Sequence, residues 1–149
     1  MIIMSNYKHI LLAVDFSDHG DEVAKTAVRL AAQNEAKLSV VHVVDNLPIT
    51  DPTYSSIPFD VDFSQEMLDN AKTRLTKFAN QLEIPEDRQW LEIGSPKLEI
   101  VRIAEENQVD LIVIGSHGRH GLALLLGSTA NGVLHHAHCD VLAVRLKSN

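Results

Sequence analysis

Residues Val109 to Cys139 read VDLIVIGSHGRHGLALLLGSTANGVLHHAHC, and this stretch decides the fold. The run Leu111–Ile114 is apolar and rich in β-branched residues, as a strand buried on both faces requires. A glycine-rich loop follows it, and an amphipathic helical pattern begins after Gly127-Ser128. Glycines let backbone N–H groups approach an anion, and a helix start adds free donors and a positive dipole end. The order strand, glycine loop, helix therefore suits a phosphate, and a loop whose glycines only turn the chain fits the spacing equally well.

Two common phosphate motifs are absent from this stretch. A Walker loop needs Gly-Lys-Ser/Thr, whereas Leu126 and not lysine stands next to Gly127-Ser128. A Rossmann fingerprint needs G-x-G-x-x-G after the first strand of its unit, whereas Gly115-x-x-Gly118 has a different first spacing and lies late in the chain. The phosphate interpretation thus depends on the order of the elements alone.

The composition is that of an ordinary soluble protein. The chain has 149 residues, of which 45% are hydrophobic and 22% charged, and we expect one domain over residues 1–149. A net charge of −7 argues against nucleic acid as a partner, because phosphate backbones bind clustered lysine and arginine. The single cysteine, Cys139, excludes an internal disulfide and fits a reducing compartment. The sequence shows neither a signal peptide nor an apolar run as long as a membrane span, so we expect a cytoplasmic protein without a membrane partner.

Apolar periodicity predicts five strands alternating with four helices. The strands are expected at residues 9–14, 38–44, 88–93, 111–114 and 140–146. The first helix is expected from Ser17 or Asp18 as N-cap to near Asn34, the second from near Ser64 to Leu82 and the third after Ser95-Pro96. In the fourth, after Ser128, the predicted apolar stripe is Ala130, Val133, Leu134 and Ala137. Residues 46–62 carry three prolines and no sustained period, which predicts a long loop.

This alternation implies an α/β fold, with a parallel sheet covered by helices on both faces through right-handed crossovers. In such sheets, ligands bind at the carboxyl ends of the strands where the winding direction reverses. Asp15 and Gly115 each stand at the carboxyl end of a predicted buried strand. If the first and fourth strands are neighbours, both residues face one crevice.

Over nearly its whole length the sequence resembles the universal stress protein family. The resemblance is carried by YKHILLAVD (Tyr7–Asp15), VHVVD (Val41–Asp45), Gly115-Ser-His-Gly118 with Gly127-Ser128, and DVLAVR (Asp140–Arg145). It implies a five-stranded parallel sheet of order 3-2-1-4-5, a Rossmann-like fold, and usually a homodimer. It also implies a stress-linked function without a well-defined reaction.

The family divides into members that bind ATP and members that do not. ATP-binding members carry Gly-x2-Gly-x9-Gly-Ser/Thr; here Gly115 and Gly118 match, but residues 119–126 leave the loop one residue short before Gly127. Members that do not bind ATP lose the glycines, and this chain keeps them. A loop absorbs one lost residue more easily than a phosphate site absorbs an added Cβ, so the resemblance favours binding of ATP with Mg²⁺.

The same resemblance implies roles for individual residues. Gly115, Gly118, Gly127 and Ser128 would line the triphosphate through backbone N–H groups and the Ser128 hydroxyl. Asp15 would lie toward the adenosine end or help to hold the metal, Val43 would offer its backbone to adenine, and Thr129 is a further candidate for a phosphate contact. The alternative for Asp15 is a helix-capping carboxylate.

Other residues with reactive side chains form weaker patterns. His117, His120, His135, His136, His138 and Cys139 lie close in sequence, but His135 and His138 share a helix face while His136 points elsewhere, and no metal-binding spacing is present. We therefore predict no native metal site there and a structural role for Cys139. His42, inside an apolar strand, is predicted to be a hydrogen-bonded core residue.

Three functions remain open at this point. The first is a stress-response protein that binds ATP and acts as a nucleotide-linked switch or chaperone-like dimer. The second is a nucleotide-independent dimeric stress protein that acts through protein contacts, and the third is a slow ATPase. Strong catalysis is not expected, because only Arg119 and His120 could act near a γ-phosphate. The dimer is expected to form through the apolar edge strand Asp140–Leu146, and the alternative is that the 46–62 loop covers this edge.

Overall fold

The structure is a computed structural model that describes residues 6–17, 20–45, 61–117 and 126–146, and for residues 61–64 the backbone alone. Its elements follow in the order β1 (His9–Val14), α1 (Gly20–Asn34), β2 (Lys37–Asp45), α2 (Val61–Gln81), the short 3₁₀ helix η1 (Glu86–Arg88), β3 (Gln89–Gly94), α3 (Pro96–Glu106), β4 (Leu111–Gly115), α4 (Ser128–His136) and β5 (Asp140–Val144). The predicted alternation of five strands and four helices is confirmed.

All five strands pair in parallel, in the order β3-β2-β1-β4-β5, which confirms the expected topology. The chain runs outward from β1 to β3 and then crosses back to place β4 on the other side of β1. At the centre of the sheet, Leu12 of β1 lies between Val40 of β2 and Val113 of β4. The first and fourth strands are therefore neighbours, and the winding direction reverses between them.

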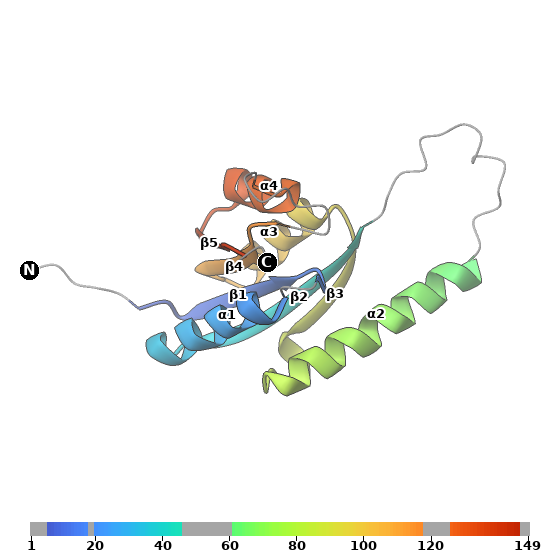
Figure 1. Ribbon diagram of the computed structural model, residues 1–149, viewed down its shortest axis with the longest axis horizontal. Coiled ribbons are helices and arrows are strands. Elements are labelled where there is room, and N and C mark those ends of the chain that lie inside the picture. The colour runs from blue at the N-terminus through green and yellow to red at the C-terminus, as the bar shows by residue number, and fades with distance from the viewer. Residues whose placement is uncertain (1–5, 18–19, 46–60, 118–125, 147–149) are drawn as a thin grey trace, which may run out of the picture.

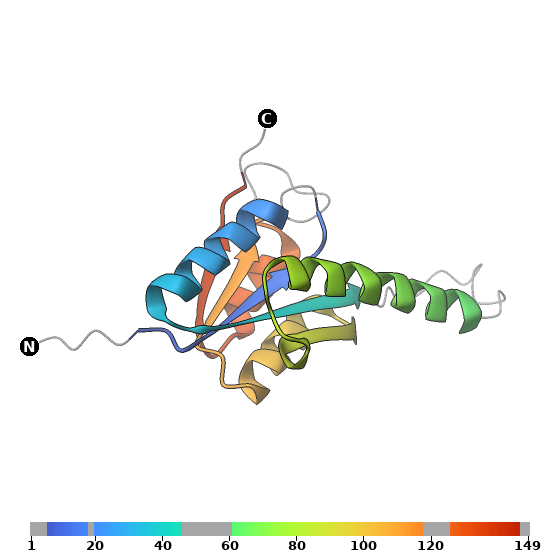
Figure 2. The same ribbon diagram turned by 90° about the horizontal axis from the view of Figure 1, so that it is seen from below.

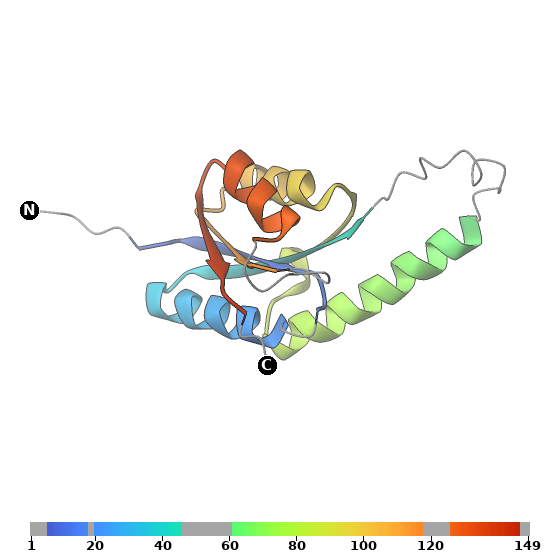
Figure 3. The same ribbon diagram turned by 45° about the horizontal axis from the view of Figure 1, so that its top comes forward.

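Helices cover both faces of the sheet, with α1 and α2 on one side and α3 and α4 on the other (Figures 1 and 3). Successive residues of β1 alternate between the two cores, because side chains of a strand point to opposite faces. Ile10 and Leu12 pack with α1 and α2, whereas Leu11 and Ala13 pack with α3 and α4, and all four are buried. This two-sided burial explains why the central strands read as unbroken apolar runs.

Only part of α2 packs on the sheet. Leu75 and Ala79, in its carboxyl-terminal half, are buried, whereas Met67 is 45% exposed. The amino-terminal half extends past the sheet, as the view in Figure 2 shows. Among the described residues, no helix is both long and apolar enough to cross a membrane.

The amino ends of the strands are joined by side-chain hydrogen bonds. The Asp110 carboxylate, just before β4, accepts the backbone N–H groups of Lys8 and His9 at 2.8 and 3.0 Å. The backbone N–H of Asp110 donates to the carbonyl of His9 at 3.0 Å. The Tyr7 hydroxyl donates to the carboxylate of Asp140, the first residue of β5, at 2.7 Å. These bonds tie β1 to β4 and β5 at one edge of the molecule.

Two predicted boundaries differ from the structure. The second helix begins at Val61, so residues 61 and 62 of the expected loop belong to α2, while the rest of that loop lies outside the described residues. The last strand ends at Val144, because its partner β4 ends at Gly115, directly opposite. Leu146 therefore leaves the ladder and is buried in the core beneath α1.

The predicted apolar stripe of the fourth helix is partly wrong. Ala130 and Val133 are buried as expected, but Leu134 is 44% exposed and Ala137 follows the end of the helix. Gly132 is buried in place of Leu134. The buried face of α4 is rotated relative to the predicted stripe, because α4 packs against α3 through Gly132. A glycine has no apolar side chain, so the apolar pattern could not predict this contact.

Candidate functional site

Three of the predicted site residues stand at the carboxyl edge of the sheet, on neighbouring strands. Asp15 follows β1 and Gly115 ends β4. Val43 lies one residue beyond the last pair of β1 and β2, which joins Val14 to His42. Because β1 and β4 are adjacent, Asp15 and Gly115 flank the point where the winding reverses, which is where open parallel sheets bind ligands.

Asp15 is exposed, and its carboxylate is tied to the turn that follows it. Its Oδ1 accepts the backbone N–H of Ser17 at 3.0 Å, which is an Asx turn. The helix α1 begins only at Gly20, whose N–H donates to the Ser17 carbonyl at 3.1 Å. Asp15 thus caps a turn before α1 rather than the helix itself, and Asp18, one of the expected N-caps, lies outside the described residues.

The amino end of α4 lies at the carboxyl end of β4. Gly127 is its N-cap, in an extended conformation, and the N–H of Gly127 donates to the Ser116 carbonyl at 2.6 Å. The first bond of the helix joins the Asn131 N–H to the Gly127 carbonyl at 2.9 Å. The N–H groups of Ser128 and Thr129 therefore precede the helical ladder, and among the described residues they, unlike that of Gly127, have no backbone acceptor and are candidate donors to an anion.

Of the glycines in the predicted loop, Gly115 is described by the structure and is closely packed. A Cβ on Gly115 would lie 3.3 Å from the Val23 side chain and 3.6 Å from that of Leu146, so this position has little room for a side chain. Gly118 lies outside the described residues. Gly115, Gly127, Ser128 and Thr129 are brought to one edge together with Asp15 and Val43.

Sequence analysis missed a cluster of side chains beside Asp15. The Phe16 ring lies 4.5 Å from the His42 ring and 6.0 Å from the Phe78 ring, between centroids, and the Arg74 guanidinium carbon lies 4.6 Å from the Phe16 centroid. The Nδ1 of His42 is 2.8 Å from the carbonyl of Val14, so the predicted hydrogen bond is present. The prediction of a core position is wrong, because His42 is half-buried at the carboxyl end of the β1–β2 pair. The sequence gives little indication of this cluster, because its members come from three separate segments: the turn after β1, strand β2 and helix α2.

The histidine-rich stretch forms no metal site among the residues that the structure describes, where no group of three or more His, Cys, Asp or Glu side chains could hold an ion. His135 and His136 are exposed, and the Nε2 of His138 lies 3.2 Å from the carboxylate of Glu105. Burial raises the pKa of the Cys139 thiol, and Asp140 and Asp110 act in the same direction. The thiolate form is thus disfavoured, as expected of a structural cysteine.

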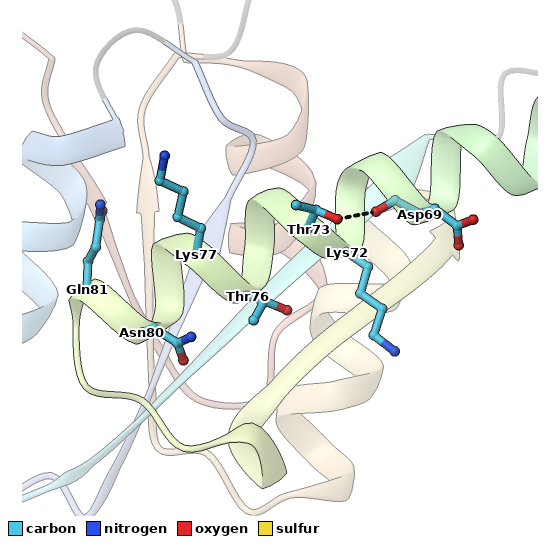
Figure 4. Close-up of a pocket in the computed structure, with 7 residues that line it drawn as sticks. All are labelled: Asp69, Lys72, Thr73, Thr76, Lys77, Asn80 and Gln81. Atoms are coloured by element: carbon cyan, nitrogen blue, oxygen red, sulfur yellow. Dashed lines mark hydrogen bonds between the residues drawn. The ribbon is translucent and has the colours of Figure 1, made fainter.

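A hollow lies away from this edge, along α2. Its lining consists of polar side chains of that one helix, namely Asp69, Lys72, Thr73, Thr76, Lys77, Asn80 and Gln81. Figure 4 shows that Lys72 and Lys77 point to different sides of the helix, and the single bond drawn joins the Thr73 hydroxyl to the Asp69 carbonyl. The side chains do not converge on a common point, so this surface is an ordinary solvated helix face.

Comparisons with known proteins point to one family. Residues 6–145 match the sequence profile of the universal stress protein family. Universal stress protein A homolog 1 of Coxiella burnetii is 44% identical over 142 residues, which cover 95% of this chain and 99% of that protein. The solved structure of hypothetical protein MJ0577 superposes with a TM-score of 0.80 at 29% identity, covering 96% of this chain and 99% of the other. A universal stress protein solved in complex with cAMP gives a TM-score of 0.60 at 25% identity, covering 95% and 98% of the two chains.

Proposed function

Because this chain belongs to the universal stress protein family, we propose that it binds ATP with Mg²⁺ at the carboxyl edge of its sheet. The triphosphate would lie against the amino end of α4, near Gly115, Gly118, Gly127, Ser128 and Thr129. The adenosine end would lie toward Asp15 and the backbone of Val43. The relative in complex with cAMP supports an adenine nucleotide as the class of ligand.

The observation that carries this proposal is the position of the amino end of α4 beside β4. The bond from Gly127 to Ser116 fixes the helix start against the strand. The N–H groups of Ser128 and Thr129 are left without helical acceptors, and the helix dipole places partial positive charge there. An anionic phosphate satisfies both the donors and the dipole.

Asp15 fits the metal that accompanies a triphosphate. Mg²⁺ binds proteins through one or two carboxylates, phosphate oxygens and several waters. The Asp15 carboxylate is exposed, and its hydrogen bond to Ser17 uses Oδ1 and leaves Oδ2 to other partners. One carboxylate at this edge is therefore enough to orient a metal that the phosphates already hold.

In the cell this binding would make the protein a nucleotide-linked switch or a chaperone-like dimer in the stress response of the cytoplasm. The loop between β4 and α4 has no Walker lysine, so we expect at most slow hydrolysis. The nucleotide-independent alternative, in which protein contacts alone carry the function, is favoured by the outer edge of β5, which no described strand covers.

The outer edge of β5, which pairs with no other strand among the described residues, also supports the homodimer. The alternative, that the 46–62 loop covers this edge, falls mainly on residues outside the described ones. The Val144 carbonyl accepts the N–H of Ser116 at 2.9 Å, so the backbone groups of Val144 point toward β4. Backbone groups alternate in direction along a strand, and those of Ala143 therefore point outward. Leu142, 37% exposed on the same strand, adds apolar surface beside this edge. A second copy could pair here in antiparallel fashion and close a two-fold dimer.

The binding proposal is tested by removing one N–H at the helix start. Ser128 is the first residue of α4, where proline is well tolerated, and the extended Gly127 before it suits a following proline. Ser128→Pro deletes the N–H and the hydroxyl, whereas Ser128→Ala deletes the hydroxyl alone. By titration calorimetry with Mg-ATP, we expect Ser128→Pro to weaken binding by about tenfold relative to Ser128→Ala, as loss of a hydrogen bond to a charged group implies.

Equal affinities of the two variants would show that the helix start does not hold the phosphates. Wild-type protein that gives neither heat nor a thermal shift at millimolar ATP would refute ATP binding altogether and leave the nucleotide-independent dimer.

A further inference from the structure

Phe16 has a backbone conformation that is unusual for an aromatic residue. Its φ is 58°, in the left-handed region that side chains with a Cβ adopt at a cost. The other described non-glycine residues with positive φ are Glu35, Glu83 and Gln108, at 53°, 58° and 57°. Each of these stands one or two residues after the end of α1, α2 or α3, where a left-handed residue is the ordinary way to end a helix. Phe16 has no such reason, since it follows a strand.

The structure surrounding the Phe16 ring accounts for this conformation. The ring is held between His42 of β2 and two residues of α2, Arg74 and Phe78, which stand one helical turn apart. A guanidinium over an aromatic face and a perpendicular pair of rings are both attractive arrangements. A small hollow of about 170 Å³ lies beside the ring, lined by residues that include Gly20 and Asp21 of α1. Arg74 and Phe78 line the same hollow, so the ring is not packed on every side and its contacts with α2 hold it in place.

The Phe16 backbone sits at the centre of the turn that carries Asp15. The Asp15 carboxylate reaches across Phe16 to the N–H of Ser17 at 3.0 Å. The φ of Phe16 thus sets the direction of Ser17 relative to the carboxylate. A change in the position of the ring is transmitted through one Cα to this hydrogen bond.

We propose that Phe16 and Arg74 are positioning residues for the nucleotide site, with Arg74 holding the Phe16 ring and the ring holding the Asp15 turn. This inference rests on the proposed function, since it concerns the same site. It makes the affinity for ATP depend on α2, a helix with no residue in the predicted site. Any partner or change that shifts α2 on the sheet would then alter nucleotide binding.

The test removes the cation from above the ring without touching the predicted site. Arg74→Gln loses the charge and the stacking group, and Arg74→Lys keeps a cation. Lys72→Gln makes the same charge change on the opposite side of α2, because residues two apart in a helix are rotated by about 200° about its axis. Both positions, 72 and 74, are on the exposed surface of the helix, so folding is not at risk. For Arg74→Gln we expect the ATP dissociation constant to rise about two- to fivefold, as a cation–π contact of ordinary strength implies, with Lys72→Gln unchanged and Arg74→Lys close to wild type.

A second measurement needs no nucleotide. The amide hydrogen exchange of Ser17, followed by NMR in the ligand-free protein, reports the bond to Asp15, and it should accelerate in Arg74→Gln but not in Lys72→Gln. Equal effects of the two glutamine variants would overturn the proposal, because only total charge would then matter. Weaker ATP binding with unchanged Ser17 exchange would also overturn it, since Arg74 would then act on the nucleotide directly. If the wild-type protein does not bind ATP, the proposed function fails. Independently of that result, unaltered Ser17 exchange in Arg74→Gln would refute the proposal that Arg74 and Phe16 position the Asp15 turn.

Discussion

His9 is a buried titratable side chain with both ring nitrogens occupied. Its Nδ1 lies 3.0 Å from the carbonyl of Asn107, so this nitrogen carries the proton and donates. Its Nε2 accepts the hydroxyl of Ser39, a fully buried residue. Burial lowers the pKa of His9 below 6.5, and the nearby charges of Lys37 and Arg88 act in the same direction. The backbone bond to Asn107 and the charge of Asp110 oppose the shift without cancelling it.

The pKa of His9 predicts a loss of stability in mild acid. The folded protein keeps His9 neutral, whereas the unfolded chain binds a proton near pH 6.5. This contribution is therefore complete above that pH and is lost as the pH falls below it. Denaturant titrations between about pH 7 and pH 5 should show the free energy of unfolding falling by up to about 1.4 kcal/mol per pH unit from this residue.

His9→Gln should flatten that part of the pH profile, even though it lowers stability at every pH. His136→Gln, which removes an exposed histidine at the end of α4, serves as the control and should leave the slope as in wild type. An unchanged slope in His9→Gln would mean that His9 remains free to take up a proton in the folded state.

At the scale of elements, α3 and α4 meet at a glycine. A Cβ on Gly132 would lie 2.5 Å from Cδ and 2.8 Å from Cβ of Lys97, at the start of α3. The Lys97 stem can move at its far end, but its Cβ is fixed by the helix backbone. The close approach of the two helices therefore depends on the missing side chain at residue 132.

Gly132→Ala is expected to lower the free energy of unfolding by about 1–2 kcal/mol, because the steric overlap outweighs the gain in helix propensity. Gly20→Ala is the matched control, since a Cβ there meets nothing within 4 Å. It should leave stability unchanged or raise it by a few tenths of a kcal/mol. Urea titrations of both variants give the comparison, and a stabilised Gly132→Ala would show that α3 and α4 have room to separate.

The elements differ in how well the sequence predicts them. The central strands were predicted to within a residue, because burial on both faces leaves unbroken apolar runs in β1 and β4. The stripe of α4 was not, since its contact with α3 is made by Gly132, a residue without apolar signal. The start of α2 was placed too late, because this end of the helix lies beyond the sheet, where no buried periodicity marks it. The strand order came from the family resemblance, which the periodicity alone does not contain.

At the scale of the molecule, the exposed β5 edge predicts a dimer with a defined geometry. Ala143→Pro removes an N–H that points away from β4, so it should abolish pairing between copies and leave the sheet of each copy intact. Leu142→Lys should weaken the same contact. Met67→Lys is the control, because it adds the same charge at a comparably exposed apolar position on α2, a helix that packs on β2 and β3 and extends past the sheet.

Sedimentation at micromolar concentration should show dimers for the wild type and Met67→Lys, and a shift toward monomers for the β5 variants. A wild type that stays monomeric at high micromolar concentration would exclude the dimer.

The positions of the candidate site residues were predictable where they follow from strand ends. Asp15 and Gly115 were predicted to share a crevice if β1 and β4 were neighbours, and they are. The sequence could not show that the Gly127 N–H is already bonded to Ser116, because that contact joins the two ends of the loop. Nor could it show the hold on Phe16, which depends on a left-handed φ and on side chains of α2. Contacts between residues far apart in the sequence produce no hydrophobic periodicity from which they could be predicted.

The hydrogen bonds of Asp110 and Tyr7 at the amino edge have a consequence for the way the sheet opens. Side chains fasten the strands at that edge, whereas the opposite edge ends in turns and helix starts. Local fluctuations should therefore be larger at the carboxyl ends of these strands than at their amino ends, where the side chains of Asp110 and Tyr7 join them. The register of β1, β4 and β5 should therefore be preserved while the turns at the carboxyl edge adjust to a ligand.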